Sequence, residues 1–521
     1  MKLKLKLKLN PPLIRSVFAA RVAVLSLGLA MAVHSALAQG PVPTVLRVVA
    51  QPAVPDLQCA AFPRAAAATA PVDMDPREIP DDKDVQAALN AARQVAAPQA
   101  TADQPSAGLL GQALPGEPYR VAVWGDSHLA AGFFTQELVK ILKLESDQVR
   151  SALIPANMNR PGVRLPLRKS CVSPHWRYEP AHALAAGAAA PGPGLVNLLT
   201  TQPGASLAWD LRNASGVAEL RQVRVLYQQT ARPLQLAISV DGGPEVEVTL
   251  SAAEGPAVLE LLGDAPLSVV RVRLVSGDMR LHGLALPVGP LTALQMDVFG
   301  YPGATVAAWK NAQPDYMAAW FAQTRYNLVM MAFGTNEGNV KPFDAMAYEL
   351  SLRASLKQMR TVFPDAACVL IAPGDRGVLV RRSEKLHQAP AVNPRKNGAR
   401  APAHGRAKKP SAGKTPARQV SVKPSQDNVG GMAKNLLQYT AVHQEIGQIQ
   451  NAVGQENGCK VWSMLNAMGG QGGAYRWVRQ NPPLMARDLI HFTVPGYQQL
   501  AQQFANDMGW EARLLLPDLK P

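Results

Sequence analysis

Residues 119–128 read YRVAVWGDSH, a short apolar run that ends in Gly-Asp-Ser-His. The run is as long as a buried strand, and residues 133–144 (FFTQELVKILKL) then repeat apolar side chains at helical spacing. This stretch predicts a strand, a tight turn and a helix. A serine in such a turn places its hydroxyl above the carboxyl edge of the sheet, where open α/β sheets carry their sites.

The same alternation returns after residue 293. Short apolar runs predict strands over 294–300, 327–334, 367–373 and 460–464, and helical periodicity predicts helices over 304–323, 343–363, 433–455 and 495–508. Repeated strand–helix units favour a parallel sheet covered by helices on both faces. The sequence therefore predicts an α/β fold of three layers.

Two segments interrupt this rhythm. Residues 195–288 contain six short alternating runs bounded by Gly, Asp and Pro, which predict an antiparallel β-sandwich inserted over 151–293. Residues 376–428 are rich in Pro, Gly, Lys and Arg without apolar periodicity, and we expect a basic, disordered insertion there. The expected domain map is a signal peptide (1–38), an Ala/Pro-rich, mostly irregular lead-in with one helix (39–117), three α/β parts (118–150, 294–375, 429–521) and these two insertions.

Composition excludes several classes of protein. Of 521 residues, 47% are hydrophobic and 17% charged, which excludes a chain that is disordered throughout. Outside the N-terminus no uncharged apolar run reaches the roughly 20 residues of a spanning helix, so a polytopic membrane protein is excluded. The net charge of +15 comes mainly from residues 1–38 and 376–424, and the remainder is close to neutral. A nucleic-acid partner is therefore not expected.

The N-terminus resembles a secretory signal. Four lysines and Arg15 precede an apolar stretch over 22–33, and Ala36-Leu37-Ala38 forms a cleavage site of the small-x-small type. We expect an exported protein, periplasmic or associated with the cell envelope, without a lipid or other stable membrane anchor. An uncleaved N-terminal anchor is the alternative.

Four cysteines in an exported chain allow three disulfide pairings. Cys368 and Cys459 begin runs that look like neighbouring parallel strands, which favours Cys368–Cys459 and, by elimination, Cys59–Cys171. Free buried thiols remain the alternative.

Four loops of the predicted sheet carry residues suited to acyl transfer. Ser127 follows the first strand, and Gly303 lies in the turn GYPGAT before a helix. Asn336 in GTNE can donate a hydrogen bond to an oxyanion. Asp488 and His491, three residues apart, can bond side chain to side chain. Each feature alone has an ordinary alternative: a helix cap, a turn glycine, a turn asparagine or a packed histidine.

Together these residues, in this order, resemble the SGNH (GDSL) hydrolase family over about 120–150, 294–375 and 429–508. The resemblance implies Ser127 as nucleophile, His491 as base and Asp488 as its partner. It implies an oxyanion hole made by Ser127 N–H, Gly303 N–H and the Asn336 amide. His128 stands where the name-giving motif has Leu; a local turn hydrogen bond and a substrate contact are its two alternatives.

The resemblance implies no metal and no cofactor. The sequence also lacks a zinc-spaced His/Cys cluster, a P-loop and a dinucleotide-binding motif. The motifs GATV, GTNE, AMGG (467–470) with Trp477, and DLIHFTVPGY look like the exported branch with peptidoglycan O-acetylesterases. That branch also carries a carbohydrate-binding-like β-domain between the Ser and Gly motifs. AMGG and Trp477 border the substrate pocket or serve in packing.

We therefore expect an exported serine esterase that removes O-acetyl groups from a wall polysaccharide, with peptidoglycan favoured. The alternatives are an esterase or acetyltransferase on another acetylated polysaccharide, a lipase-like enzyme, and a glycan-binding protein with a relic active site. At high positive charge, residues 376–428 are expected to contact anionic envelope polymers electrostatically, unless the tract is a tolerated insertion without a partner.

Overall fold

The computed structural model describes residues 40–52, 54–59, 77–95, 110–185, 187–381 and 436–515. The expected signal peptide and nearly all of the basic tract lie outside these residues. No helix in these ranges is both long enough and apolar enough to span a membrane.

The centre of the molecule is a six-stranded sheet in which all neighbouring strands are parallel, as the α/β pattern predicted. Its order is β20-β18-β17-β3-β16-β4. The strand bounds are β3 (Tyr119–Gly125), β4 (Val149–Arg150), β16 (Leu294–Gly300), β17 (Leu328–Ala332), β18 (Ala367–Ala372) and β20 (Lys460–Ser463). Gly125 lies level with Gly300 on one side and with Ala332 on the other. Three strands therefore end together, and their loops meet at one edge.

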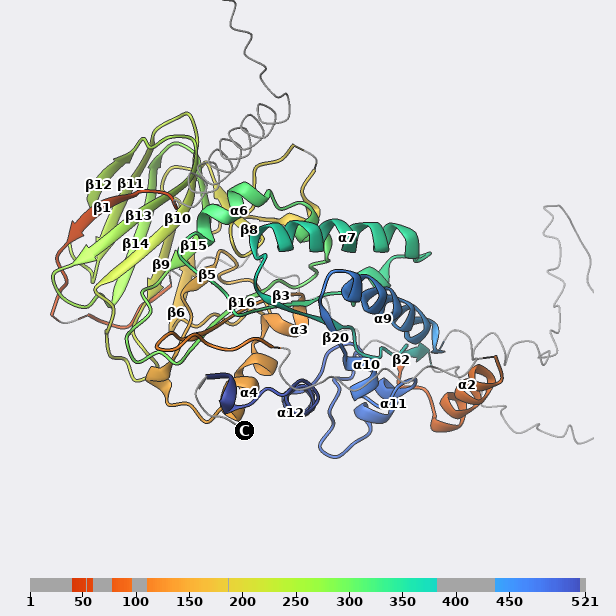
Figure 1. Ribbon diagram of the computed structural model, residues 1–521. Helices are drawn as coiled ribbons and strands as arrows, with labels where there is room; N and C mark the ends of the chain where they lie inside the picture. Colours follow the sequence, from red (N-terminus) through yellow and green to blue (C-terminus); the bar gives the residue numbers. More distant parts are fainter. Residues whose placement is uncertain are drawn as a thin grey trace, which may run out of the picture.

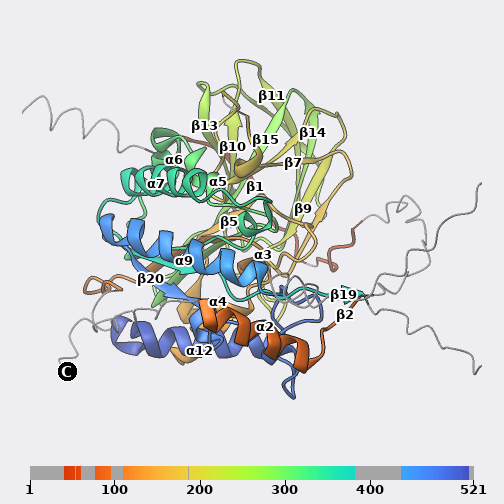
Figure 2. The same cartoon turned by 90° about the vertical axis from the view of Figure 1, so that its right-hand side faces the viewer.

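Helices cover both faces of this sheet (Figures 1 and 2). One face carries α7 (Ala345–Val362) and α9 (Gln438–Glu456), and the other carries α4 (Phe133–Ile141) and α12 (Val494–Met508). The remaining helices are α2 (Asp82–Val95), α3 (Ser127–Ala130), α5 (Ala307–Lys310), α6 (Pro314–Phe321), α10 (Met464–Ala467) and α11 (Gly473–Val478), with 3₁₀ turns η1 (Ser146–Gln148), η2 (Ala181–Ala183), η3 (Glu337–Asn339) and η4 (Ala512–Leu515).

Strand β3 shows why the central strand reads as a continuous apolar run. Val121 and Val123 pack into the cluster that contains α4 and α12, while Ala122 and Trp124 face the cluster on the other side. Because side chains of a strand alternate between the two faces, burial on both faces requires apolar residues at every position. This buried strand holds the loop that follows it rigidly.

A β-sandwich lies beside the α/β domain (Figure 1). One sheet has the order β1-β13-β10-β15-β8-β7 with β5 beside β15, and the other has the order β12-β11-β14-β9-β6. The bounds are β1 (Pro43–Val48), β5 (Leu153–Pro155), β6 (Lys169–Val172), β7 (Arg177–Pro180), β8 (Val196–Thr200), β9 (Ser206–Asp210), β10 (Gln222–Gln229), β11 (Leu234–Val240), β12 (Val246–Leu250), β13 (Gly255–Gly263), β14 (Val269–Ser276) and β15 (Met279–Ala285). All pairs are antiparallel except β1 with β13.

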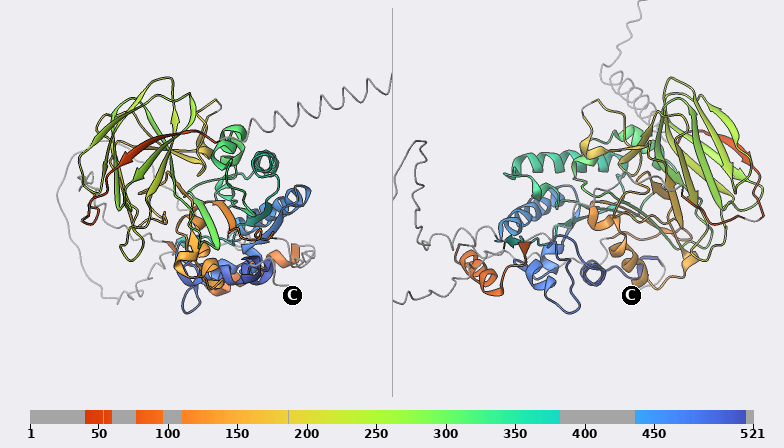
Figure 3. Two further views of the ribbon diagram at one scale, coloured as in Figure 1. Left: turned by 60° about the vertical axis from the view of Figure 1, so that its left-hand side comes forward. Right: turned by 180° about the vertical axis from the view of Figure 1, so that it is seen from behind.

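The lead-in differs from the mostly irregular segment expected over 39–117. Residues 43–48 form β1, which adds a parallel edge strand to the sandwich, and Leu57 is buried with Cys171. The expected helix is α2, which lies at the far end of the molecule from β1 (Figures 1 and 3). The lead-in thus belongs partly to the sandwich and partly to the α/β domain.

Two further boundaries differ from expectation. The helix expected over 304–323 is split into α5 and α6. Pro314 lacks the N–H that would continue a helix and instead begins α6. The basic insertion was expected from residue 376, but residues 376–381 are placed, and Val380–Arg381 (β19) pairs with Arg77–Glu78 (β2).

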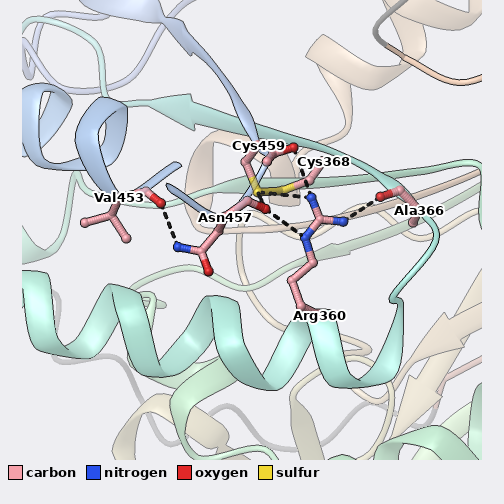
Figure 4. The surroundings of a disulfide bond; sticks show 7 residues. Arg360, Ala366, Cys368, Val453, Asn457 and Cys459 are labelled. Atoms are coloured by element: carbon pink, nitrogen blue, oxygen red, sulfur yellow. Dashed lines mark hydrogen bonds between the residues drawn. A yellow bond between two sulfur atoms is a disulfide. The ribbon is translucent and has the colours of Figure 1, made fainter. Parts of the chain in front are cut away.

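Both favoured disulfides, Cys368–Cys459 and Cys59–Cys171, are formed. The first joins the starts of β18 and its neighbour β20 (Figure 4). Arg360 from α7 donates hydrogen bonds to the carbonyls of Ala366, Asn457 and Gly458 around it. The disulfide therefore lies at the amino edge of the sheet, opposite the loops that carry the candidate site.

Candidate active site

The last residues of β3 and β16 are glycines that leave no room for side chains. A Cβ at Gly125 would lie 2.7 Å from the Ala332 carbonyl oxygen, and one at Gly300 would lie 2.4 Å from the backbone nitrogen of Ala130. The strand ends therefore pack directly against one another and against α3. Asp126 caps this helix, since its Oδ1 accepts a hydrogen bond of 2.9 Å from the backbone N–H of His128. These contacts fix the position of Ser127.

Ser127, His491 and Asp488 are brought into one hydrogen-bonded chain. His491 Nε2 lies 3.1 Å from Ser127 Oγ, and His491 Nδ1 lies 2.7 Å from Asp488 Oδ2. The other carboxylate oxygen of Asp488 accepts hydrogen bonds from the backbone N–H groups of Ile490 and His491. The Asp therefore orients both the ring and the loop that carries it. This is the arrangement of a nucleophile, a base and an orienting group.

The environment shifts the pKa values of this pair in opposite directions. Burial alone would raise the pKa of Asp488, but hydrogen bonds from the His491 ring and from two backbone N–H groups lower it to about 2. The hydrogen bond to Asp488 raises the pKa of His491, and partial burial opposes this rise. Asp488 is thus ionised at neutral pH and stabilises a proton on His491, as general-base catalysis requires.

The expected oxyanion donors lie at the same edge of the sheet. In the described part of the chain, the backbone N–H groups of Ser127 and Gly303 donate to no protein acceptor. Gly303 adopts a φ of +88°, a conformation that favours glycine. Asn336 Nδ2 donates one N–H to the Ala304 carbonyl at 2.8 Å. Because an amide nitrogen carries two N–H groups, the second is left for a ligand.

Glu337 is a residue of this site to which the sequence analysis gave no role. Its carboxylate accepts hydrogen bonds from Val306 N–H at 2.7 Å and from Gly334 N–H at 3.0 Å. It thereby links the loop of Gly303 to the loop of Asn336. Burial raises its pKa to about 7, against the hydrogen bonds from the two N–H groups. Glu337 is visible in the GTNE motif, but its role depends on contact between two loops that are distant in sequence.

The chain is similar to solved structures of esterases. A structure described as a peptidoglycan O-acetylesterase in action matches with a TM-score of 0.50 and 20% identity, over 75% of this chain and 90% of that chain. The chain has the SGNH hydrolase fold. No protein-family model and no curated protein matches it.

Two other solved structures match with lower TM-scores. A GDSL-like lipase from Parabacteroides merdae has a TM-score of 0.24 and 14% identity, over 42% of this chain and 74% of that chain. A family two carbohydrate esterase from Clostridium thermocellum with cellohexaose has a TM-score of 0.23 and 9% identity, over 64% and 99%. We draw no argument from these two.

His128 occupies a buried position of the SGNH fold. Its side chain is 4% exposed, and its Nδ1 lies 3.2 Å from the hydroxyl of Tyr497 on α12. Burial lowers the pKa of His128 to about 3, so the ring is neutral. Of the two sequence alternatives, the local turn hydrogen bond is made by the backbone N–H of His128 to Asp126. The ring makes a hydrogen bond across to another helix and is not open to substrate.

The AMGG segment and Trp477 pack within this SGNH domain. Met468 is 2% and Trp477 4% exposed, and the Trp477 ring lies 5.6 Å from that of Phe492. Phe492 follows His491 directly. Of the two alternatives, the structure therefore favours packing: these side chains support the loop that carries the histidine. Within the described residues, no group of His, Cys, Asp and Glu could hold a metal ion.

Proposed function

We propose that this protein is an exported serine esterase that removes O-acetyl groups from a cell-wall polysaccharide, with peptidoglycan as the substrate. The hydrogen-bonded chain from Asp488 through His491 to Ser127 carries the proposal. The O-acetylesterase with the same fold supports the choice of substrate. The basic N-terminal residues and the apolar stretch over 22–33 support export.

The first half of the reaction forms an acetyl-enzyme. His491 Nε2 accepts the Ser127 proton as Oγ attacks the acetyl carbonyl. The carbonyl oxygen becomes an oxyanion, which accepts hydrogen bonds from the N–H groups of Ser127 and Gly303 and from the Asn336 amide. The intermediate collapses, the bond to the sugar oxygen breaks, and His491 returns its proton to that oxygen. The free sugar hydroxyl leaves, and Ser127 carries the acetyl group.

The second half uses water. His491 accepts a proton from the water as its oxygen attacks the acetyl carbonyl, and the same donors hold the second oxyanion. The bond to Ser127 Oγ breaks, His491 protonates Oγ, and acetate leaves. Asp488 stays ionised throughout, because its pKa lies far below neutrality. A sugar hydroxyl in place of water would make the reaction a transfer.

The test compares acetate release from O-acetylated peptidoglycan and from acetyl-xylan, together with p-nitrophenyl esters of rising chain length. We expect peptidoglycan to be the better polymer and the acetyl ester the better small substrate. Ser127→Ala should lower turnover by about 10⁴–10⁶-fold and leave the fold intact. A variant that keeps a tenth of wild-type turnover would contradict the nucleophile assignment. Faster acetate release from acetyl-xylan than from peptidoglycan would contradict the assignment of peptidoglycan as the substrate.

A further inference from the structure

Two arginine side chains lie beside the loops of the Ser127–His491 pair. Many arginines of the fold pair with carboxylates, as Arg212 does with Asp210 and Arg353 with Glu349, and others bond backbone carbonyls, as Arg360 does. Two arginines beside the site, Arg160 and Arg376, have no carboxylate partner in the described part of the chain. An unpaired guanidinium is costly where solvent is partly excluded.

Arg376 lies on the loop after β18, which is bound to the loop of the catalytic pair. The neighbouring Gly377 N–H donates to the carbonyl of Leu489 at 3.0 Å, between Asp488 and His491. The guanidinium lies 4.1 Å from the centre of the Tyr439 ring. Its Nε and Nη1 are buried, and neither has a hydrogen-bond partner. The side chain thus packs on an aromatic ring, and two of its nitrogen donors, Nε and Nη1, make no hydrogen bond.

Arg160 lies on the other side of the site. Its segment is hydrogen-bonded to both of the nearby loops: Asn157 Nδ2 donates to the Gly300 carbonyl, and Arg164 N–H donates to the Ala130 carbonyl. The Arg160 guanidinium lies 5.2 Å from the centre of the ring of Tyr301, two residues before Gly303. This segment begins the sandwich, so the inserted domain supplies one wall of the site.

The order of the sheet shows that the two arginines flank the serine. Ser127 follows β3, Arg160 reaches the end of β16, and Arg376 follows β18 beyond β17. The acids nearest to the serine do not neutralise them. Asp126 is 1% exposed, Glu337 holds two backbone N–H groups, and Asp488 is engaged with His491.

We propose that Arg160 and Arg376 bind carboxylate groups of an acidic glycan, with the carboxylate of the acetylated sugar bound by one of the two. A planar guanidinium offers paired donors that match a carboxylate, and stacking on Tyr301 or Tyr439 keeps the fork oriented. The inference rests on the proposed esterase function and narrows its substrate to a polymer of acidic sugars. The carboxylate has two sources, the lactyl group of a muramic acid that carries no stem peptide, or C6 of a uronic acid.

Matched substrates test this directly. One pair is O-acetylated N-acetylmuramic acid and the same compound with its carboxylate converted to a methylamide. The other pair is O-acetylated glucuronic acid and its methylamide. We expect kcat/KM of the wild type to favour one of the acids over its amide by about 10- to 100-fold, the range for hydrogen bonds to charged groups. The pair that shows this preference identifies the source of the carboxylate.

Because these sugars carry one carboxylate, the Gln variant of the arginine that binds it, Arg376→Gln or Arg160→Gln, should lower the acid-to-amide ratio by about tenfold. Arg232→Gln, an exposed arginine in the turn between β10 and β11, should leave it unchanged. Arg376→Lys keeps the positive charge but loses the paired N–H donors, so it should lower the ratio by less than the Gln variant. It also tests the role of Arg376 if Arg376→Gln does not fold. Salt should weaken the preference, because it screens exposed charges.

A wild-type ratio near one for both pairs would overturn the inference, and so would a ratio that neither glutamine variant changes. Hydrolysis of p-nitrophenyl acetate separates this result from the proposed function. If that hydrolysis depends on Ser127 while the ratio stays near one, the esterase stands and the acidic-glycan inference fails. If Ser127→Ala hydrolyses the ester like the wild type, the proposed function itself fails.

Discussion

The ring centres of His128 and His491 lie 5.6 Å apart, the first buried and neutral and the second poised to accept a proton. A second charged imidazole at this distance would oppose the imidazolium that His491 forms in the proposed reaction. Burial keeps His128 uncharged, so it packs against the catalytic loop without this penalty. Its hydrogen bond to Tyr497 joins α3, which begins with Ser127, to α12, the helix that follows the loop of His491.

His128→Leu should therefore be tolerated. The leucine fills a similar buried space, and the cost is the unpaired hydroxyl of Tyr497, about 1–3 kcal/mol of folding stability. Thermal unfolding should report this loss, while kcat falls only a few-fold. The pH at which kcat/KM is half-maximal should not move. A loss of activity as large as that of Ser127→Ala would instead place His128 in the chemistry.

Asn336→Ala should lower kcat by about 10²–10³-fold with little change in KM, because the amide acts on charge that develops in the transition state. Steady-state kinetics on p-nitrophenyl acetate measures both constants. Asn339→Ala, an exposed change three residues further on, is the matched control and should retain activity. An effect confined to KM would make Asn336 a ground-state binding residue.

The pH profile of kcat/KM should follow His491. Its pKa in the folded protein is raised by Asp488, and only the neutral ring can accept the serine proton. Activity should therefore rise with pH through a pKa above 6.5, the ordinary value for histidine. Asp488→Asn removes the charge that raises this pKa, so the residual activity should titrate at lower pH. Its kcat should fall by about 10⁴-fold. An unshifted profile would contradict the pairing.

Glu337→Gln should lower kcat by at least about tenfold, because an amide NH₂ would then face the N–H of Val306 or of Gly334. Stability should also respond to pH. The folded pKa of Glu337 is about 7 against an ordinary value of 4.5, so its contribution to stability is complete below pH 4.5 and is lost as the pH rises through 7. The Tm of the wild type relative to Glu337→Gln should fall over this interval. A flat difference would contradict the buried carboxylate.

The set of candidate site residues was predictable because each of its members follows a strand or precedes a helix that the periodicity reveals. Ser127 begins α3 directly after β3, and Gly303, Asn336 and His491 lie in loops whose flanking elements all appear in the structure. Their meeting follows from parallel strands, since such strands end at a common edge.

Other features depend on contacts that no local pattern carries. Glu337 matters because it joins loops around Val306 and Gly334, and the placement of Arg376 depends on Tyr439, which lies beyond the basic tract. The six residues of β1 pair with β13 more than two hundred residues later. A short strand amid Ala and Pro gives no sign of such a partner. In contrast, the break before α6 does have a local signal, because the sequence contains Pro314 at this point.

The strand β1 and the Cys59–Cys171 disulfide make the two domains interlocked rather than modular. The sandwich is closed by a piece of chain that precedes the whole hydrolase domain, so the polypeptide passes from one domain to the other and back again. Excising residues 151–293 would leave β1 without a neighbour and Cys59 without its bond. A transplant of the sandwich onto another protein would need residues 43–59 as a second, detached donor segment. Any recombination event that exchanged this domain between relatives would have had to carry the codons for residues 43–59 together with those for residues 151–293.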